Sequence, residues 1–233
     1  MGSDPGVGVD PAYQVGEVID PETEDAAVVL GESIRRLMSA AVLTGLDAAD
    51  RIAIAAEIDQ LTERLSVDLR AIMPWPAPES MARAMRPFSP VIGTANPLAP
   101  PMTVENLSDG TVIGQVTFEP IHEGPPGGVH GGWVASVLDQ LLGHANAAAG
   151  AVGMTAELTV RYRRRTPYGV PLQLRARNDS IDGRRVHSSG EIVADGVVTA
   201  EATGFFLQPS AARIAQIKGI LGAPADASAD GVA

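Results

Sequence analysis

The sequence predicts an α+β domain in which an antiparallel β-sheet wraps around one buried helix. Three observations lead to this prediction. A stretch from Trp133 to Ala145 is apolar at helical spacing. The segments around it alternate between apolar and polar residues, two before it and four after it. The turns between successive segments are short and contain Asp-Gly pairs, which join neighbouring strands as hairpins.

The expected strands follow from this alternation and from the turns. The first two flank a Ser108-Asp109-Gly110 turn, and the last three are separated by turns at Asp182-Gly183 and Asp195-Gly196. We therefore expect strands at residues 102–107, 111–119, 154–163, 170–180, 185–194 and 197–207. They belong to a predicted domain of residues 81–209, followed by a tail of residues 210–233.

A glycine-rich loop leads into the predicted central helix, which ends near Gly150. Residues 124–132 hold five glycines and two prolines, a composition that regular structure does not tolerate. The first N–H groups of a helix have no partner within the helix and mark the positive end of its dipole. We expect this junction to present backbone donors to a ligand, which glycine allows to approach the main chain closely.

The region before the sheet is expected to be a helical extension. Residues 1–21 are rich in Gly, Pro and Asp and are predicted to be disordered. Residues 22–80 are predicted to form an αα-hairpin and a proline-rich linker. Its first helix covers residues 24–43, and its second starts at a cap on Asp47 and carries an apolar stripe up to Ile72. We expect the hairpin to pack on the sheet domain or on a partner subunit, with a lid over the site as the alternative.

The composition excludes several classes of function. The net charge of −11 argues against nucleic acid as the main partner. No segment approaches the run of about 18 apolar residues that a membrane span needs. The first 25 residues are acidic, lack Lys and Arg, and do not resemble a signal peptide. The absence of cysteine excludes disulfides, thiolate metal sites and a cysteine nucleophile. A cytoplasmic protein is expected.

A short set of motifs gives a family resemblance. His130-Gly131-Gly132 begins the helix, Asp139 follows nine residues after the histidine, and Thr155-Ala156 begins the next strand. Together with the glycine loop and residues 96–101, these motifs resemble hotdog-fold acyl-CoA thioesterases, in particular the phenylacetyl-CoA thioesterase-like and THEM-type enzymes. The resemblance covers roughly residues 88–208. It implies a hotdog fold and the hydrolysis of an acyl-CoA substrate to free acid and coenzyme A.

Thioester hydrolysis needs donors for the developing oxyanion and a group that activates water or attacks the carbonyl itself. The backbone N–H groups of Gly131 and Gly132 suit the first task. Asp139 suits the second, as a general base or as a carboxylate nucleophile. His130 is interpreted as an orienting or capping group or, if catalytic, as a donor on the oxyanion side. Thr155, as the resemblance implies, would orient water or Asp139.

The spacing of these residues predicts a site shared by two subunits. Gly131 and Asp139 lie eight residues apart, about 12 Å along a helix axis. An aspartate side chain cannot bridge that gap, whereas an antiparallel second helix places Gly131 of one subunit beside Asp139 of the other. If both residues are catalytic, a two-fold homodimer with two composite sites follows. Whether two dimers join into a dimer of dimers is left open.

Coenzyme A carries phosphates, so basic residues near the site are expected to bind it. The candidates are arginines at strand ends that bracket the glycine loop: Arg163, Arg164, Arg165, Arg184 and Arg185. The alternative is a solvated, charged sheet edge that discourages strand pairing. Ser136, one turn before Asp139, is interpreted as a small packing residue or as part of the site lining. No metal or cofactor is expected.

Two other functions stay open. A hotdog hydratase or dehydratase would use an Asp-x4-His pair. Asp139 and His144 have that spacing, but five residues on a helix place the two side chains about 140° apart. A non-catalytic acyl-CoA-binding or regulatory module would keep the glycine loop and the basic residues without needing Asp139. The sequence does not specify which acyl chain is preferred.

Overall fold

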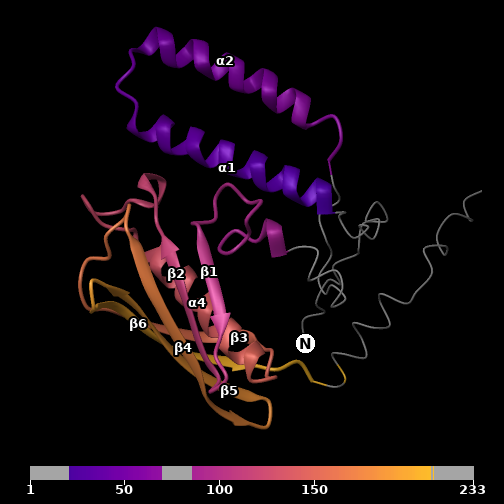
Figure 1. Ribbon diagram of the computed structural model, residues 1–233, viewed down its shortest axis with the longest axis vertical. Helices are drawn as coiled ribbons and strands as arrows, with labels where there is room; N and C mark the ends of the chain where they lie inside the picture. The colour runs from indigo at the N-terminus through magenta and orange to yellow at the C-terminus, as the bar shows by residue number, and fades with distance from the viewer. Residues whose placement is uncertain (1–20, 70–85, 211, 213–233) are drawn as a thin grey trace, which may run out of the picture.

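A computed structural model describes residues 21–69, 86–210 and 212 of the chain. The predicted disordered N-terminus (apart from its last residue), the proline-rich linker and most of the predicted tail lie outside these residues. Figure 1 shows the described part as a curved sheet around one helix, with two further helices at one end. This arrangement confirms the predicted fold class, an antiparallel sheet with a central helix and a helical extension.

The sheet has six antiparallel strands in the order β1-β2-β4-β5-β6-β3. They are β1 (Met102–Asn106), β2 (Thr111–Thr117), β3 (Met154–Tyr162), β4 (Pro171–Asp182), β5 (Arg185–Ala194) and β6 (Val197–Leu207). The largest differences from the predicted strands are at two ends. β2 stops two residues early because Pro120 starts a short 3-10 helix, η2 (Pro120–His122). β4 runs two residues further, to the hairpin turn at Gly183.

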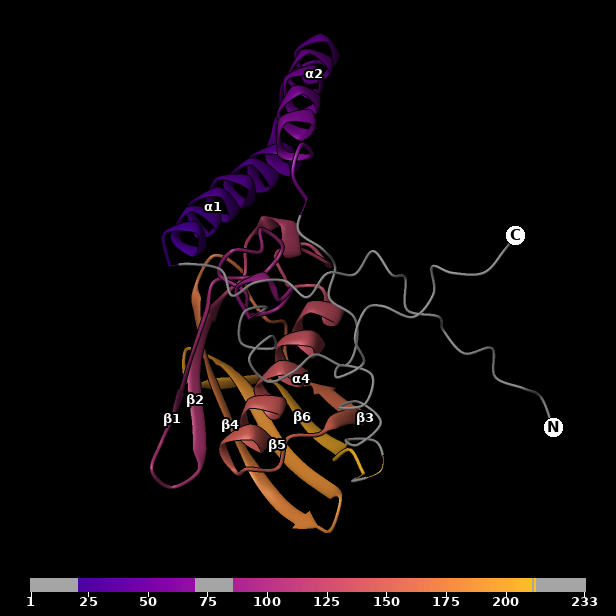
Figure 2. The same ribbon diagram turned by 90° about the vertical axis from the view of Figure 1, so that its right-hand side faces the viewer.

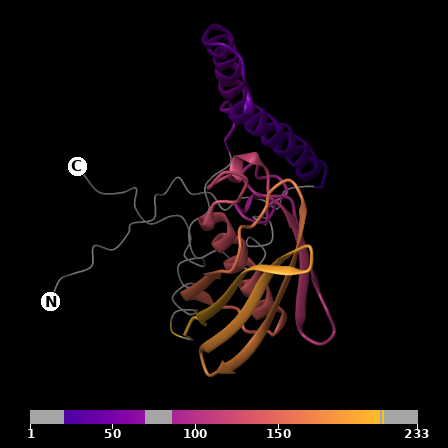
Figure 3. The same ribbon diagram turned by 90° about the vertical axis from the view of Figure 1, so that its left-hand side faces the viewer.

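The central helix, α4 (Gly131–Ala148), lies on one face of the sheet and buries its apolar side there. Figures 2 and 3 show this from opposite sides. The buried residues of the helix are Val134, Val137, Leu138, Leu141, Leu142, Ala145 and Asn146. Two glycines of the sheet make room for it. A Cβ at Gly190 or Gly204 would lie 3.1 or 2.9 Å from a methyl carbon of Leu142. The helix can therefore approach β5 and β6 closely.

The first helix of the extension, α1 (Pro21–Leu43), packs on the sheet domain at η2. It begins three residues before the predicted start, because proline is well suited to the first helical position. Arg35 is buried and donates from Nε to Ala99 O at 3.0 Å and from Nη2 to Asn96 O at 3.1 Å. The loop before β1 is thereby tied to α1.

The second helix, α2 (Ala48–Leu65), buries none of its residues. Asp47 caps it as predicted, accepting from Asp50 N at 3.0 Å. The predicted stripe extends too far: the helix ends at Leu65, where Ser66 forms the C-cap, so Leu69 lies beyond it. Figure 2 shows α2 directed away from the sheet. Among the described residues, α1 therefore packs on the sheet domain as expected, and α2 does not.

Candidate functional site

The glycine loop before α4 is held in place by a carboxylate at its start. Glu123 Oε1 accepts from Gly127 N at 2.9 Å and from the Tyr168 hydroxyl at 3.2 Å. This hydrogen bond raises the pKa of the Tyr168 phenol. Gly127 has a φ of +70°, a conformation that favours glycine. Contacts within the chain thus fix the conformation of the loop.

Arg165 holds the same loop from the other side. Its Nη1 donates to Pro126 O at 3.1 Å. A Cβ at Gly128 would lie 2.6 Å from Arg165 Cγ, so a larger residue at this position would displace the arginine. The sequence analysis expected Arg165 to bind a phosphate; in the structure one nitrogen of its guanidinium supports the loop, and its other donors are left.

His130 caps the start of α4 and accepts a hydrogen bond from Gly132 N–H, one of the two predicted oxyanion donors. Its Nδ1 accepts from Gly132 N at 3.0 Å. Gly131 N–H has no acceptor among the described residues. In this arrangement the free donor at the helix start is therefore Gly131 N–H. A neutral His130 that accepts at Nδ1 carries its proton on Nε2, which makes the other side of the ring a donor.

Asp139 lies on the half-exposed side of α4, away from its buried leucines. At 100° per residue, Leu138 and Leu142 point into the core while Asp139 points towards the edge of the sheet. Thr155 at the start of β3 donates from Oγ1 to Asp139 Oδ1 at 2.8 Å. The structure thus brings together two predicted residues through Oδ1, and Oδ2 has no hydrogen bond to the described residues.

The donor Gly131 lies at the start of α4 and the carboxylate of Asp139 lies near its middle, beside opposite ends of β3. Because α4 is one continuous helix, Gly131 and Asp139 are about 12 Å apart along its axis. β3 runs beside it in the opposite direction. Thr155 lies next to Asp139, and Tyr162 lies next to Gly131, to whose carbonyl oxygen its hydroxyl donates at 2.9 Å. The sequence analysis did not select Tyr162, since its place in the alternation of a strand carries no chemical signal.

β3 forms one edge of the sheet, and no other described strand pairs with its outer side. Among the described strands it pairs with β6 alone, and seven of its nine residues are exposed. Ser136, on the neighbouring half-exposed side of α4, donates its hydroxyl to Gly132 O at 2.8 Å. The serine hydroxyl therefore bonds a carbonyl of its own helix, one turn earlier. A long edge strand with free N–H and C=O groups is a template for another strand.

The arginines at the loop end of β3 have different surroundings. Arg163 pairs with Glu201 on the neighbouring strand and thereby lowers the pKa of that carboxyl. Arg164 is exposed, and its side chain bonds none of the described residues. Of the three predicted phosphate ligands here, Arg164 is the one whose guanidinium makes no hydrogen bond to the described residues, whereas Arg163 and Arg165 each use one nitrogen.

The other two arginines lie at the opposite end, near the start of β3. Arg184 Nε donates to Gln208 O at 2.8 Å, and the guanidinium of Arg185 lies 5.8 Å from the ring centroid of Phe205. These contacts are on the protein surface and leave donors on both guanidinium groups. The predicted cluster is therefore two groups, one beside Gly131 and one at the Thr155 end.

A buried histidine, His122, contacts the start of α4 through His130 and Trp133. Its Nδ1 accepts from Glu119 N at 2.9 Å, its Nε2 is 3.2 Å from Leu98 O, and its ring packs edge-on against Trp133 in the first turn of α4. Burial lowers the pKa of this imidazole, because it removes water from the charged form. His122 O also accepts from His130 N at 2.8 Å, which ties it directly to the cap.

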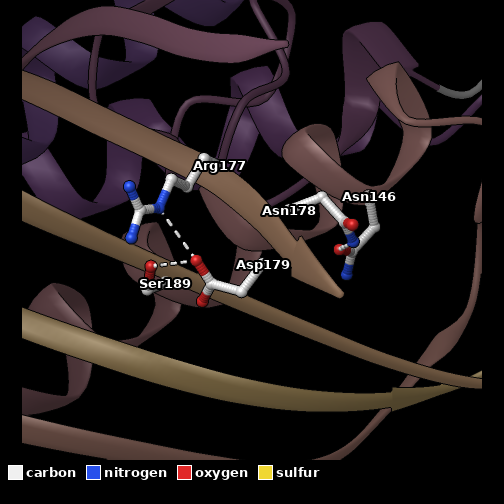
Figure 4. A network of polar contacts seen from close by, with 5 residues as sticks. All are labelled: Asn146, Arg177, Asn178, Asp179 and Ser189. Carbon is white, nitrogen blue, oxygen red and sulfur yellow. Dashed lines mark hydrogen bonds and ion pairs between the residues drawn. The ribbon is translucent and has the colours of Figure 1, made fainter. Parts of the chain in front are cut away.

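Figure 4 shows polar contacts on both faces of β4, of which the Asn178–Asn146 pair ties the far end of α4 to the sheet. Asn146 is fully buried, and its Oδ1 accepts from Asn178 Nδ2 at 2.9 Å. On the other face of β4, Asp179 Oδ1 accepts from Arg177 Nε and from Ser189 Oγ at 2.9 and 3.0 Å. The bond from Asn178 ties the helix to the sheet near its C-terminal end, as the His130 cap and Tyr162 do at its start, whereas the Asp179 bonds join β4 to β5.

Neither a metal centre nor a membrane span is found in the part of the chain that the structure describes. No group of three or more acidic or histidine residues there could hold a metal ion. No helix there is both long and apolar enough to cross a bilayer. The hydratase alternative is also disfavoured, because α4 is helical from Asp139 through His144 and directs the two side chains about 140° apart.

Known proteins are similar to this chain in fold and in sequence. The family model described as the thioesterase superfamily matches residues 126–209. A crystal structure of a thioesterase superfamily protein has 37% sequence identity and a TM-score of 0.70, and the similarity covers 78% of this chain and 94% of that one. The chain belongs to the thioesterase superfamily. The resemblance inferred from the His-Gly-Gly, Asp and Thr motifs is thereby confirmed.

Within this superfamily the chain is similar to proteins named acyl-coenzyme A thioesterase THEM4. The protein from Xenopus laevis is 38% identical over 96 residues, which are 38% of this chain and 41% of that protein. The protein from Bos taurus is 33% identical over 91 residues, which are 38% of this chain and 37% of that protein. The similarity therefore spans about two fifths of the length of these curated relatives.

Proposed function

We propose that the protein hydrolyses acyl-CoA thioesters to the free acid and coenzyme A, in a site shared by two subunits. Membership of the thioesterase superfamily and the similarity to proteins named acyl-coenzyme A thioesterases support the reaction class. The observation that carries the proposal is the Thr155–Asp139 hydrogen bond. It holds a half-exposed carboxylate on the central helix, beside an uncovered strand edge, with one oxygen free for water or substrate.

In the proposed reaction Asp139 takes a proton from a water molecule as the water attacks the thioester carbonyl. Gly131 N–H donates to the oxyanion that forms, with His130 Nε2 as a second donor. The C–S bond then breaks, the acid leaves, and the coenzyme A thiolate takes up the proton. Direct attack by Asp139 would instead give an anhydride that water opens. Hydrolysis in 18O water under single-turnover conditions detects the second route, because attack of water on the aspartyl carbonyl of the anhydride places 18O in the Asp139 carboxylate, which general-base catalysis never does.

We propose that pairing of two β3 strands builds the site. Two antiparallel β3 strands would place the Thr155 end of one beside the Tyr162 end of the other. Asp139 of one subunit then approaches Gly131 of the other, which a single chain cannot achieve across about 12 Å. The same pairing gathers the two groups of arginines, with Arg164 from one subunit and Arg185 from the other at one end. Phosphates of coenzyme A fit such a pair of guanidinium groups.

The test of the activity is thiol release from acyl-CoAs of short, long and aryl acyl groups, comparing the wild type with Asp139→Asn. The substitution keeps the shape and removes the carboxylate. Asp179→Asn is the matched control, since Asp179 also accepts side-chain hydrogen bonds but lies on the outer face of the sheet. We expect turnover by the wild type and the control and collapse in Asp139→Asn. Binding of acyl-CoA without hydrolysis would instead identify a non-catalytic binding module.

The shared site is tested by mixing two inactive variants, Asp139→Asn and Gly131→Pro. Random exchange gives heterodimers in half of the population, each with one intact and one doubly defective site. About one quarter of the wild-type activity is then restored. If each chain used its own Gly131 and Asp139, mixing would restore none.

A further inference from the structure

We propose that Tyr162 is a positioning residue for His130 and acts through the peptide group that joins Gly131 to Gly132. Its kinetic consequence rests on the proposed thioesterase function. The structural part, which concerns the protonation of the His130 ring, does not.

Two hydrogen bonds meet at the opposite ends of one peptide group. The Tyr162 hydroxyl donates to Gly131 O at 2.9 Å, and Gly132 N–H donates to His130 Nδ1 at 3.0 Å. Gly131 C=O and Gly132 N–H belong to the same planar amide. A donor at the oxygen polarises that amide and makes its N–H a stronger donor, as in other chains of hydrogen bonds.

These two linked hydrogen bonds determine which nitrogen of His130 carries the proton. An N–H that donates to Nδ1 requires a lone pair there, so the neutral ring is protonated at Nε2. The bond from Gly132 N–H also fixes the orientation of the His130 ring at the start of α4. Nε2–H is then available on the side of the ring away from the helix. In the proposed reaction this is the proton that His130 would offer to the oxyanion.

The bond from Tyr162 is not needed to complete the helix. Carbonyl groups of the first helical turn already accept N–H groups of the following turn. Tyr162 is itself 55% exposed, so its hydroxyl could bond to water instead. Yet its ring lies against the helix start: a Cβ at Gly131 would be 3.3 Å from both Cζ and Oη of the tyrosine. The absence of a side chain at Gly131 therefore allows this close contact.

The test compares Tyr162→Phe with the wild type by two measurements. Phenylalanine keeps the ring and removes only the hydroxyl. Imidazole 15N spectra of the full-length protein report the tautomer of each histidine, and the His130 signal is assigned by its loss in His130→Gln. Tyr168→Phe is the matched control, since it removes a tyrosine hydroxyl bond from Glu123 of the same loop without touching Gly131.

We expect the Nε2–H tautomer of His130 to dominate in the wild type and in Tyr168→Phe, and to become a mixture in Tyr162→Phe. We also expect kcat of Tyr162→Phe to fall about three- to tenfold with KM within twofold, as loss of one neutral hydrogen bond implies. An unchanged tautomer overturns the inference, whether kcat falls or not, because Tyr162 would then act only through packing. If the wild type hydrolyses no acyl-CoA, the proposed function fails, while the spectra still decide the role of Tyr162.

Discussion

Gly131→Pro removes one backbone N–H from the proposed site and little else. Gly131 is the first residue of α4, a position where proline is favoured. The residue before a proline must be extended, and His130 already has a φ of −60° and a ψ of 134°. Proline at this position therefore deletes the unpaired donor without breaking a helical hydrogen bond.

The expected effect can be worked out from the number of donors. Gly132 N–H already bonds to His130 Nδ1, so Gly131 N–H is the backbone donor left for the oxyanion. Losing one oxyanion donor typically costs about 3 kcal/mol of transition-state stabilisation, or about 100- to 1,000-fold in kcat. The new Cβ would lie 3.3 Å from the Tyr162 ring and needs a shift of a few tenths of an ångström. Gly131→Ala brings the same Cβ and keeps the N–H, so it measures the effect of that Cβ alone.

The assay is thiol release at saturating acyl-CoA for both variants, with thermal melting and oligomeric state recorded alongside. We expect kcat of Gly131→Pro to be at least 100-fold below that of Gly131→Ala, with similar melting temperatures. A ratio below about threefold would refute the assignment, because it corresponds to less than about 0.7 kcal/mol. The oxyanion would then have to be bound elsewhere, with the side chain of His130 as the next candidate.

The remaining predictions concern one catalytic contact and two structural ones. Thr155→Val removes the hydroxyl that bonds Asp139 and should lower kcat about five- to 30-fold, the equivalent of about 1–2 kcal/mol for a partly exposed bond to a charged group. His122 has a lowered pKa in the folded state, so the unfolded chain binds this proton at higher pH. The free energy of unfolding should therefore be highest above about pH 6.5 and decrease below it, by at most about 1.4 kcal/mol per pH unit, until the folded histidine is protonated too. Gly204→Ala should destabilise the fold by about 1–3 kcal/mol, because its Cβ would lie 2.9 Å from Leu142 Cδ1 and even closer to a phenylalanine ring.

Each of these three predictions has a matched control variant. Thr155→Ser keeps the hydroxyl and should recover most of the activity, and equal loss in both variants would contradict the role given to the bond. The decrease of stability at acidic pH should be shallower in His122→Gln, and parallel pH curves would rule out His122 as its source. Gly143→Ala has open space around its Cβ and lies inside α4, so it should stabilise by about 0.5–1 kcal/mol. Destabilisation by both alanines would mean that crowding at Gly204 is not the cause.

Much of the fold could be predicted because its signals are local. The alternation of apolar residues and the Asp-Gly turns predicted the six strand ends at the three hairpins within two residues. The end of α2 could not be predicted from its apolar stripe, because that stripe continues past Ser66 and Asp68, which favour the end of a helix. The exposure of α2 could not be predicted either, since an amphipathic pattern does not specify which surface covers its apolar face.

The sequence by itself determined the sheet around a central helix, the superfamily, and the places of Asp139, Thr155 and the glycine-rich helix start. These follow from residue types at fixed spacings along single elements. Tertiary structure alone decided that Gly132 N–H is taken by His130, that Arg165 supports the loop, and that Tyr162 meets Gly131 from 31 residues away. Such contacts depend on the direction of side chains between α4 and β3. That direction is fixed by packing of the helix on the sheet rather than by any local pattern.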